Sequence, residues 1–142
     1  MGKMVLFIED EVFTVRALAK CLKECEGYTV DLVEDLREAA KLLSSKKYDL
    51  LILDIMLPHD GVIDQNVSPK ESGIAFVREL QKGIIAGQNV SENTDVPIVV
   101  LTAVVDPRSM KKIRELKPAV LLRKPVAWKE FLAAVQKAEG NK

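Results

Sequence analysis

The fold is decided by one stretch of the chain, Asp49-Leu50-Leu51-Ile52-Leu53-Asp54-Ile55-Met56-Leu57-Pro58. Its four consecutive aliphatic residues, 50 to 53, are typical of a strand buried on both faces, as in a parallel sheet covered by helices. The apolar run stops at Asp54. A carboxylate at the carboxyl end of such a strand lies where open α/β sheets form their ligand crevice, so Asp54 is the first candidate for chemistry. The alternative is an aspartate that only caps the following turn.

The composition indicates one folded domain. The chain has 142 residues, of which 48% are hydrophobic, and this length can bury its own core. Its 21 basic and 21 acidic residues cancel, and neither sign forms a long block, which argues against binding of nucleic acid or an anionic membrane. The apolar run at residues 5–8 is too short for a signal peptide or a transmembrane span. These features predict a soluble cytoplasmic protein.

The two cysteines, Cys21 and Cys25, lie four residues apart on one side of a predicted helix. The sequence has no further cysteine for a disulfide framework or a zinc site with four ligands. Buried free thiols in a reducing compartment are therefore predicted.

Strand and helix patterns alternate along the chain. Strands are predicted at residues 5–8, 28–33, 50–53, 96–101 and 119–122. Helical spacing follows each strand, and two polar segments, 59–71 and 87–95, are predicted to be loops. Because parallel crossovers are right-handed and helices must cover both faces, we expect an α/β fold with a doubly wound five-stranded parallel sheet and five helices.

Several helix ends carry signals of their own. Asp35, followed three residues later by Glu38, predicts a capped helix start. Asp106-Pro107 predicts another, with proline in the first turn. Gly27 is expected to end the first helix.

The carboxyl ends of parallel strands meet at one edge of such a sheet. The polar residues at these ends are Glu9, Asp10, Asp54, Thr102 and Lys124. Three carboxylates in one crevice repel each other unless a cation neutralises them, and oxygen ligands with room for water suit Mg²⁺. One carboxylate could then attack phosphorus to give an aspartyl phosphate, while Lys124 and Thr102 contact phosphoryl oxygens.

Each of these residues has a plainer explanation when taken alone. Glu9 and Asp10 can stabilise the start of the next helix through its dipole. Thr102 can be an ordinary strand-end threonine, and Lys124 can be a solvated loop lysine. Their joint occurrence at the ends of different buried strands favours a site.

These residues carry a resemblance: the sequence is similar to a response-regulator receiver domain of the two-component signalling systems. The markers, in the family's order, are Glu9-Asp10, the strand 50–54 followed by Met56-Leu57-Pro58, Thr102-Ala103 and Lys124-Pro125. The resemblance implies a flavodoxin-like receiver fold and a single receiver domain over residues 1–142. It also implies two insertions, near residues 60–71 and 84–95.

The resemblance implies that Asp54 accepts a phosphoryl group from the phosphohistidine of a sensor histidine kinase or phosphotransfer protein. Asp10 and Asp54 are implied as direct Mg²⁺ ligands, Glu9 as a ligand acting largely through water, and Met56 as a ligand through its backbone carbonyl. Such a domain promotes only its own phosphorylation and dephosphorylation, so no enzyme activity on other substrates is expected.

The resemblance also implies how the signal is passed on. Thr102 is the hydroxyl that moves onto the phosphoryl group, Lys124 is its ionic partner, and the Lys124-Pro125 peptide is cis. A surface formed by the fourth helix, fifth strand and fifth helix then changes conformation toward a downstream effector protein. Leu122 stands where the family usually has an aromatic residue that moves inward on activation. Val104 is apolar near the path of attacking water, which suggests a long-lived phosphoryl group.

Three other features have ordinary explanations. His59 is a lone loop histidine and is expected to be solvated. Asp60, Asp64 and Asn66 fail the spacing of a calcium loop, so a solvated loop or a partner surface is favoured. Trp128 is expected in the core.

Other functions remain as alternatives. A receiver-like binding module that works without phosphorylation would lack Asp54, Asp10 or Lys124, and all three are present. A phosphatase with an aspartate nucleophile needs a second carboxylate where Met56 stands, and a dinucleotide site needs a glycine-rich turn after the first strand. No output domain is expected after the last helix, and both a stand-alone regulator and a fragment of a longer regulator or hybrid kinase remain open.

Overall fold

The computed structural model describes residues 3–57, 61–64, 66–103 and 106–140. Its main sheet has five parallel strands in the order β2-β1-β3-β6-β7. The strands are β1 (Met4–Ile8), β2 (Thr29–Val33), β3 (Leu50–Asp54), β6 (Ile98–Thr102) and β7 (Val120–Arg123). The predicted α/β fold with a doubly wound parallel sheet is confirmed, and the stretch that decides it forms the central strand.

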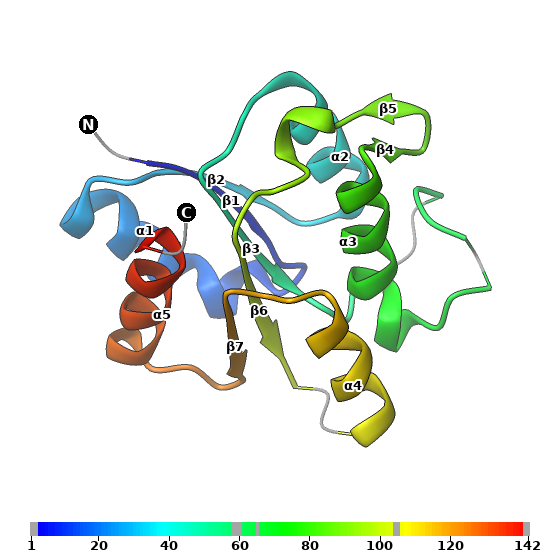
Figure 1. The fold of residues 1–142 in the computed structure, drawn as a ribbon. Helices are drawn as coiled ribbons and strands as arrows, with labels where there is room; N and C mark the ends of the chain where they lie inside the picture. Colours follow the sequence, from blue (N-terminus) through cyan, green and yellow to red (C-terminus); the bar gives the residue numbers. More distant parts are fainter. Residues whose placement is uncertain (1–2, 58–60, 65, 104–105, 141–142) are drawn as a thin grey trace.

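Five helices cover the two faces of this sheet (Figure 1). They are α1 (Val12–Glu26), α2 (Leu36–Ser45), α3 (Ser72–Lys82), α4 (Pro107–Glu115) and α5 (Trp128–Gly140). Helices α1 and α5 lie on one face, and α2, α3 and α4 lie on the other. Among the described residues, no helix is both long and apolar enough to cross a bilayer.

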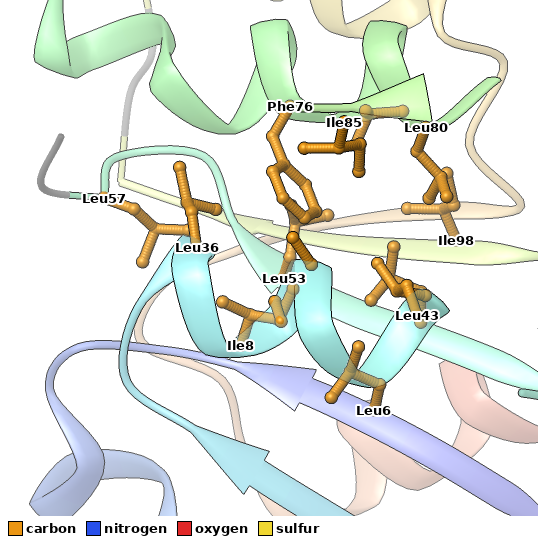
Figure 2. Packing of buried hydrophobic residues seen from close by; sticks show 14 of the residues in the cluster. Leu6, Ile8, Leu36, Leu43, Leu53, Leu57, Phe76, Leu80, Ile85 and Ile98 are labelled. Atoms are coloured by element: carbon orange, nitrogen blue, oxygen red, sulfur yellow. The ribbon is translucent and has the colours of Figure 1, made fainter. Parts of the chain in front are cut away.

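Each face of the sheet has its own hydrophobic cluster because successive strand residues point to opposite sides. Leu51 and Leu53 of β3 join the cluster under α2 and α3, whereas Leu50 and Ile52 join the cluster under α1 and α5. Figure 2 shows side chains of the first cluster, with Phe76 among those that pack over the sheet. With all five residues of β3 buried, the strand is held rigidly on both sides up to its last residue.

The predicted helix ends are confirmed where the structure describes them. The Asp35 carboxylate accepts the Glu38 N–H at 2.7 Å, and the Asp106 carboxylate accepts the Ser109 N–H at 3.0 Å. Gly27 ends α1 with a φ of 75°, a left-handed conformation that suits glycine.

The two polar segments contain more structure than the predicted loops. Residues 84–89 form an antiparallel hairpin, β4 (Ile84–Ile85) and β5 (Gln88–Asn89), and a 3-10 helix, η2 (Ser91–Asn93), follows it. A second 3-10 helix, η1 (Pro69–Glu71), precedes α3. The loop prediction for residues 87–95 was wrong at Gln88–Asn89, which form β5, because a strand of two residues shows no periodicity.

The prediction for the thiols is met only in part. Cys21 is free and half-buried, and the side chain of Cys25 lies outside the description. Trp128 is half-buried against the cluster under α1 and α5, with its ring centroid 6.1 Å from that of Phe131, which agrees with the predicted core role.

Candidate functional site

Four neighbouring strands bring the predicted residues to one edge of the sheet. The register pairs Ile8 with Leu53, Asp54 with Leu101, and Thr102 with Arg123. Glu9, Asp54, Thr102 and Lys124 therefore end β1, β3, β6 and β7 at about the same level. The side chains of Glu9 and Thr102 are fully buried, Asp54 is 5% exposed, and Lys124 is half-buried.

The Lys124 ammonium is the centre of this group. Its Nζ lies 2.8 Å from Asp54 Oδ2, 2.5 Å from Glu9 Oε1 and 3.8 Å from Glu11 Oε1. One ammonium thus faces three carboxyl groups, which is more than it can pair with fully. A lysine in these contacts is no longer a plain solvated loop residue.

Glu11 is a member of this group that the sequence reasoning did not select. Oxygen atoms of Glu9, Glu11 and Asp54 all lie within 4.8 Å of one another. The Glu11 N–H donates to Glu9 Oε2 at 3.3 Å, and this local turn brings the third acid of the run back toward the site. The only signal in the sequence was the third acid itself, directly after Glu9-Asp10.

Asp10 is not part of this carboxylate cluster. Its side chain is exposed, and it lines a cavity of about 470 Å³ together with Glu11, Asp54, Met56 and Lys124. Asp10 is therefore at the mouth of the site rather than among the three clustered carboxylates. The ligand set Glu9, Asp10, Asp54 and Met56 stays a prediction.

Burial and charge shift two pKa values at the site. Burial raises the pKa of Glu9 to about 7; the hydrogen bond from Lys124 opposes this shift, and the nearby negative charge of Asp54 adds to it. Burial alone would lower the pKa of Lys124, but its contacts with Asp54 and Glu9 outweigh burial and raise it. Lys124 thus stays charged, and a further positive charge beside Glu9 would oppose the effect of burial on its pKa.

The loop after Asp54 is held in place by the start of α3. Asp54 Oδ1 accepts the Met56 N–H at 3.0 Å, which leaves Met56 42% exposed at the cavity. The buried Ser72 hydroxyl accepts the Leu57 N–H at 2.8 Å. A Cβ at Gly73 would lie 2.7 Å from Ile55 Cα, so only glycine allows this approach. The sequence had marked Ser72 and Gly73 only as a helix start.

The cavity and its donors fit a small, hard cation. Every donor in the acidic cluster is a carboxylate oxygen, and the adjoining cavity leaves room for the waters that Mg²⁺ retains. The cluster has three carboxyl groups around the one Lys124 ammonium, so a cation that kept all three ionised would be favoured there.

The structure also tests predictions for several residues around the carboxylate cluster. The Lys124-Pro125 peptide is cis, as the resemblance implied, and Leu122 is buried at 7% exposure. Asp64 is exposed, and its carboxylate accepts the Asn66 N–H at 2.9 Å, as in a solvated loop. His59, Asp60 and Val104 lie outside the described residues.

Comparison with known proteins gives a consistent picture. The family model described as "Response regulator receiver domain" matches residues 5–136. The transcriptional regulatory protein CusR of Escherichia coli strain K12 is 36% identical over 132 residues, which cover 93% of this chain and 49% of that protein. Hybrid signal transduction histidine kinase B of Dictyostelium discoideum is 27% identical over 139 residues, which cover 96% of this chain and 7% of that protein.

Solved structures agree at the level of the fold. The chemotaxis response regulator CheY4 of Vibrio cholerae has a TM-score of 0.76 and 21% identity over 97% of this chain and 99% of that one. A CheY-like receiver domain protein from Methanospirillum hungatei has a TM-score of 0.73 and 16% identity over 99% of this chain and 96% of that one. The chain spans about half the length of CusR and of two further regulators that it matches.

Proposed function

Because the chain belongs to the response regulator receiver domain family, we propose that it accepts a phosphoryl group on Asp54 from the phosphohistidine of a sensor histidine kinase or phosphotransfer protein. The observation that supports this proposal best is the placement of Asp54. Its carboxylate ends the central strand, opens on the cavity, and lies 2.8 Å from Lys124 Nζ.

The chain's own residues suggest how the transfer proceeds. A carboxylate oxygen of Asp54 forms a bond to phosphorus while the phosphorus–nitrogen bond of the donor breaks, and the electron pair of that bond stays on the imidazole nitrogen. Lys124 is close enough to Asp54 to pair with an oxygen of the transferred group. Thr102, at the end of the neighbouring strand, is the proposed hydroxyl donor to a second oxygen.

Mg²⁺ is part of this proposal. When bound, the ion would neutralise the carboxylates and the phosphoryl oxygens. We propose that Glu9, Asp10, Asp54 and the Met56 carbonyl would hold the ion. Glu11 would also be near it, because oxygen atoms of Glu9, Glu11 and Asp54 lie within 4.8 Å of one another. The three acids on the β1 side differ in burial, so they are expected to contribute unequally.

The output is proposed to be a conformational change read by a downstream effector protein in the cytoplasm. CusR is named as a transcriptional regulator, and the Dictyostelium relative as a hybrid kinase, so the match extends to proteins of different architecture. The single receiver domain over residues 1–142, with insertions near 60–71 and 84–95, is part of the same proposal. No reaction on an external substrate is proposed.

The test is the intact mass of the protein after incubation with acetyl phosphate and Mg²⁺. We expect one added phosphoryl group in the wild type, and none in Asp54→Ala or in a sample with excess EDTA. If small donors fail, a histidine kinase is used as donor with the same controls.

A chain that stays unmodified with both donors and binds no Mg²⁺ by calorimetry would contradict the proposal. The alternative, a receiver-like binding module that works without phosphorylation, would then be favoured. The lifetime of the phosphoryl group tests the Val104 hypothesis separately, since decay within seconds would contradict it.

A further inference from the structure

The cavity on which Asp54 opens has two unlike kinds of lining. One part is charged and holds the carboxylates around Lys124. The other part is apolar, and its members are Met56, Leu57, Pro69 and Ala103. Leu57 is buried, whereas the other three are exposed. These three therefore lie where a molecule that enters the cavity meets the protein.

Pro69 reaches this cavity from residues 60–71, the first of the two proposed insertions. Met56 and Leu57 belong to the loop directly after Asp54, and Ala103 directly follows the end of β6. Pro69, in contrast, is the first residue of the 3-10 helix η1 that precedes α3. The inserted segment thus supplies part of the wall of the phosphoacceptor cavity.

Pro69 is held in place by hydrogen bonds around Ser72. The buried Ser72 hydroxyl lies 3.1 Å from the Pro69 carbonyl oxygen and 2.6 Å from the Leu57 carbonyl oxygen, and it accepts the Leu57 N–H at 2.8 Å. The Ser68 carbonyl accepts the Glu71 N–H at 2.8 Å. The proline ring also restricts the backbone angle φ. One serine therefore ties the inserted segment to the loop after Asp54.

The described residues before Pro69 are anchored by their own apolar side chains. Val62 and Ile63 are buried in the cluster under α2 and α3, and the half-buried Val67 packs against the same cluster. Burial of these side chains stabilises one position of the segment. Pro69 therefore presents a defined apolar surface to the cavity.

The leaving group of a phosphoryl donor has to pass this surface. In phosphoryl transfer, the attacking and leaving atoms lie roughly in line with phosphorus. When Asp54 attacks, the leaving group is therefore on the side of phosphorus away from the carboxylate, toward the part of the cavity where Met56 and Pro69 are exposed. The exposed carboxylates of Asp10 and Glu11 line the same cavity.

Two classes of donor differ in this leaving group. A phosphorylated imidazole releases a planar ring with apolar carbon edges, whereas an acyl phosphate releases a carboxylate anion. The ring gains from contact with a proline side chain, because apolar surface is removed from water. A carboxylate loses hydration there and is repelled by Asp10 and Glu11. Among the described residues that line the cavity, Lys124 is the only cation, and it already contacts Asp54.

We propose that Pro69 is a specificity-determining residue, which makes the Asp54 site favour a phosphorylated imidazole over an acyl phosphate as donor. An Asp54 oxygen forms the bond to phosphorus, the phosphorus–nitrogen bond breaks, and the nitrogen keeps the electron pair. A purely structural role, in which Pro69 only starts η1, would affect both donors alike. The inference rests on the proposed function, because it concerns the donor in the same transfer.

The test compares phosphoimidazole with acetyl phosphate as donor to the full chain in the presence of Mg²⁺. Intact mass against time gives the rate of uptake from each donor. The measured quantity is the ratio of the phosphoimidazole rate to the acetyl phosphate rate, compared between variant and wild type, so that the intrinsic reactivity of each donor cancels.

Two substitutions change the wall in different ways. Pro69→Ala removes most of the apolar ring, and we expect it to lower the ratio about three- to tenfold. Pro69→Lys also brings a positive charge toward the leaving group, so it should lower the ratio further by raising the acetyl phosphate rate. The matched control is Pro107→Ala, which removes the exposed proline that starts α4 and does not line the cavity. Its ratio should stay within about twofold of wild type.

An unchanged ratio in both Pro69 variants would overturn the inference and leave the proposed function standing. Equal falls in both rates would do the same, since they indicate a structural role. A wild type that takes up nothing from phosphoimidazole would also overturn it, because a cavity suited to imidazole should accept this donor. Only if acetyl phosphate and a histidine kinase fail as well is the proposed function contradicted too.

Discussion

The two ends of β3 differ in how well the nearby carboxylates are matched by hydrogen-bond donors and positive charges. At its start, Asp31 accepts hydrogen bonds from Tyr48 at 2.6 Å and Lys46 at 3.1 Å, and Asp49 accepts the Met4 N–H at 2.8 Å. At its end, Glu9, Glu11 and Asp54 share the single Lys124 ammonium. Matched partners stabilise the fold, whereas unmatched carboxylates cost stability and leave capacity for a ligand. We call the first group the stable end of β3, and the second, where Asp54 is the proposed phosphoacceptor, the chemical end.

The start of β3 is also where residues 91–93 are anchored. Asn93 is 1% exposed, accepts the Tyr48 N–H at 2.8 Å, and donates to the carbonyls of Leu43 at 2.8 Å and Lys46 at 2.7 Å. One side chain thus satisfies three backbone groups of the α2–β3 connection. Residues 91–93, which were predicted to lie in a polar loop, therefore belong to the stable end of β3.

The largest effect is expected at the chemical end. Asp54→Asn should reduce phosphoryl incorporation to background, because the amide is not a nucleophile for phosphorus. The free energy of unfolding should stay within about 1 kcal/mol of wild type or rise, because Lys124 keeps Glu9 as its partner and one repulsive charge is gone. Intact mass and urea unfolding measure the two effects. A loss of stability of several kcal/mol would show that Asp54 is structural.

At the stable end, Asn93→Ala should show the reverse pattern. It leaves three backbone groups without their partner and should lower the free energy of unfolding by about 2–4 kcal/mol, as measured in urea. The fraction that remains folded should still take up phosphate. Asn66→Ala, at an exposed position, is the control and should change stability by less than about 0.5 kcal/mol. A similar result for both variants would refute the anchoring role.

Gly73→Ala tests how closely the chemical end depends on α3. The added Cβ would lie 2.7 Å from Ile55 Cα and 2.8 Å from the Asp54 carbonyl oxygen, so backbone must move. We expect a loss of about 1–3 kcal/mol in stability and slower phosphoryl uptake, because the displaced loop carries Asp54 and Met56. Gly140→Ala meets no atom within 4 Å and serves as the control. If Gly73→Ala takes up the phosphoryl group at the wild-type rate, the position of the loop after Asp54 does not control the transfer.

The smallest expected effect is the contribution of Asp31 to the free energy of unfolding, which depends on pH. Burial acts to raise the pKa of Asp31, but the hydrogen bonds from Tyr48 and Lys46 outweigh it and hold the pKa below its ordinary 3.8. A lowered folded-state pKa stabilises the protein above the unfolded-state value, and this contribution is lost as the pH falls through the folded-state value. Asp31→Asn should therefore cost about 1 kcal/mol near neutral pH and progressively less in acid. Thermal unfolding across the acid range measures it; a cost that does not vary with pH would exclude this ion pair as the cause.

Several elements could be predicted from the sequence because their signals are local. Four aliphatic residues before Asp54 indicated the central strand, and Asp35 and Gly27 indicated helix ends. The rule that parallel strands share their carboxyl edge then brought Glu9, Asp54, Thr102 and Lys124 together. Each of these inferences needs only a short window of sequence or the order of the strands.

The contacts that distinguish this chain depend on long-range packing. The sequence did not indicate that the exposed Glu11, rather than Asp10, brings its carboxylate close to the buried carboxylates of Glu9 and Asp54, because that choice depends on how the chain turns after β1. The role of Asn93 depends on carbonyls 47 and 50 residues away in the chain. The pairing of Lys112 of α4 with Glu71 joins residues that are 41 positions apart in the chain.

The sequence by itself determined the alternation of strands and helices, the parallel sheet and the edge at which chemistry is possible. Periodic burial and strand order are sufficient for these features, because they depend on averages over many residues. Only the tertiary structure decided which carboxylates share Lys124, how Asn93 anchors the start of β3, and that Pro69 lines the cavity at Asp54. Those outcomes depend on contacts of a few ångströms between distant segments, and a local sequence pattern does not specify such distances.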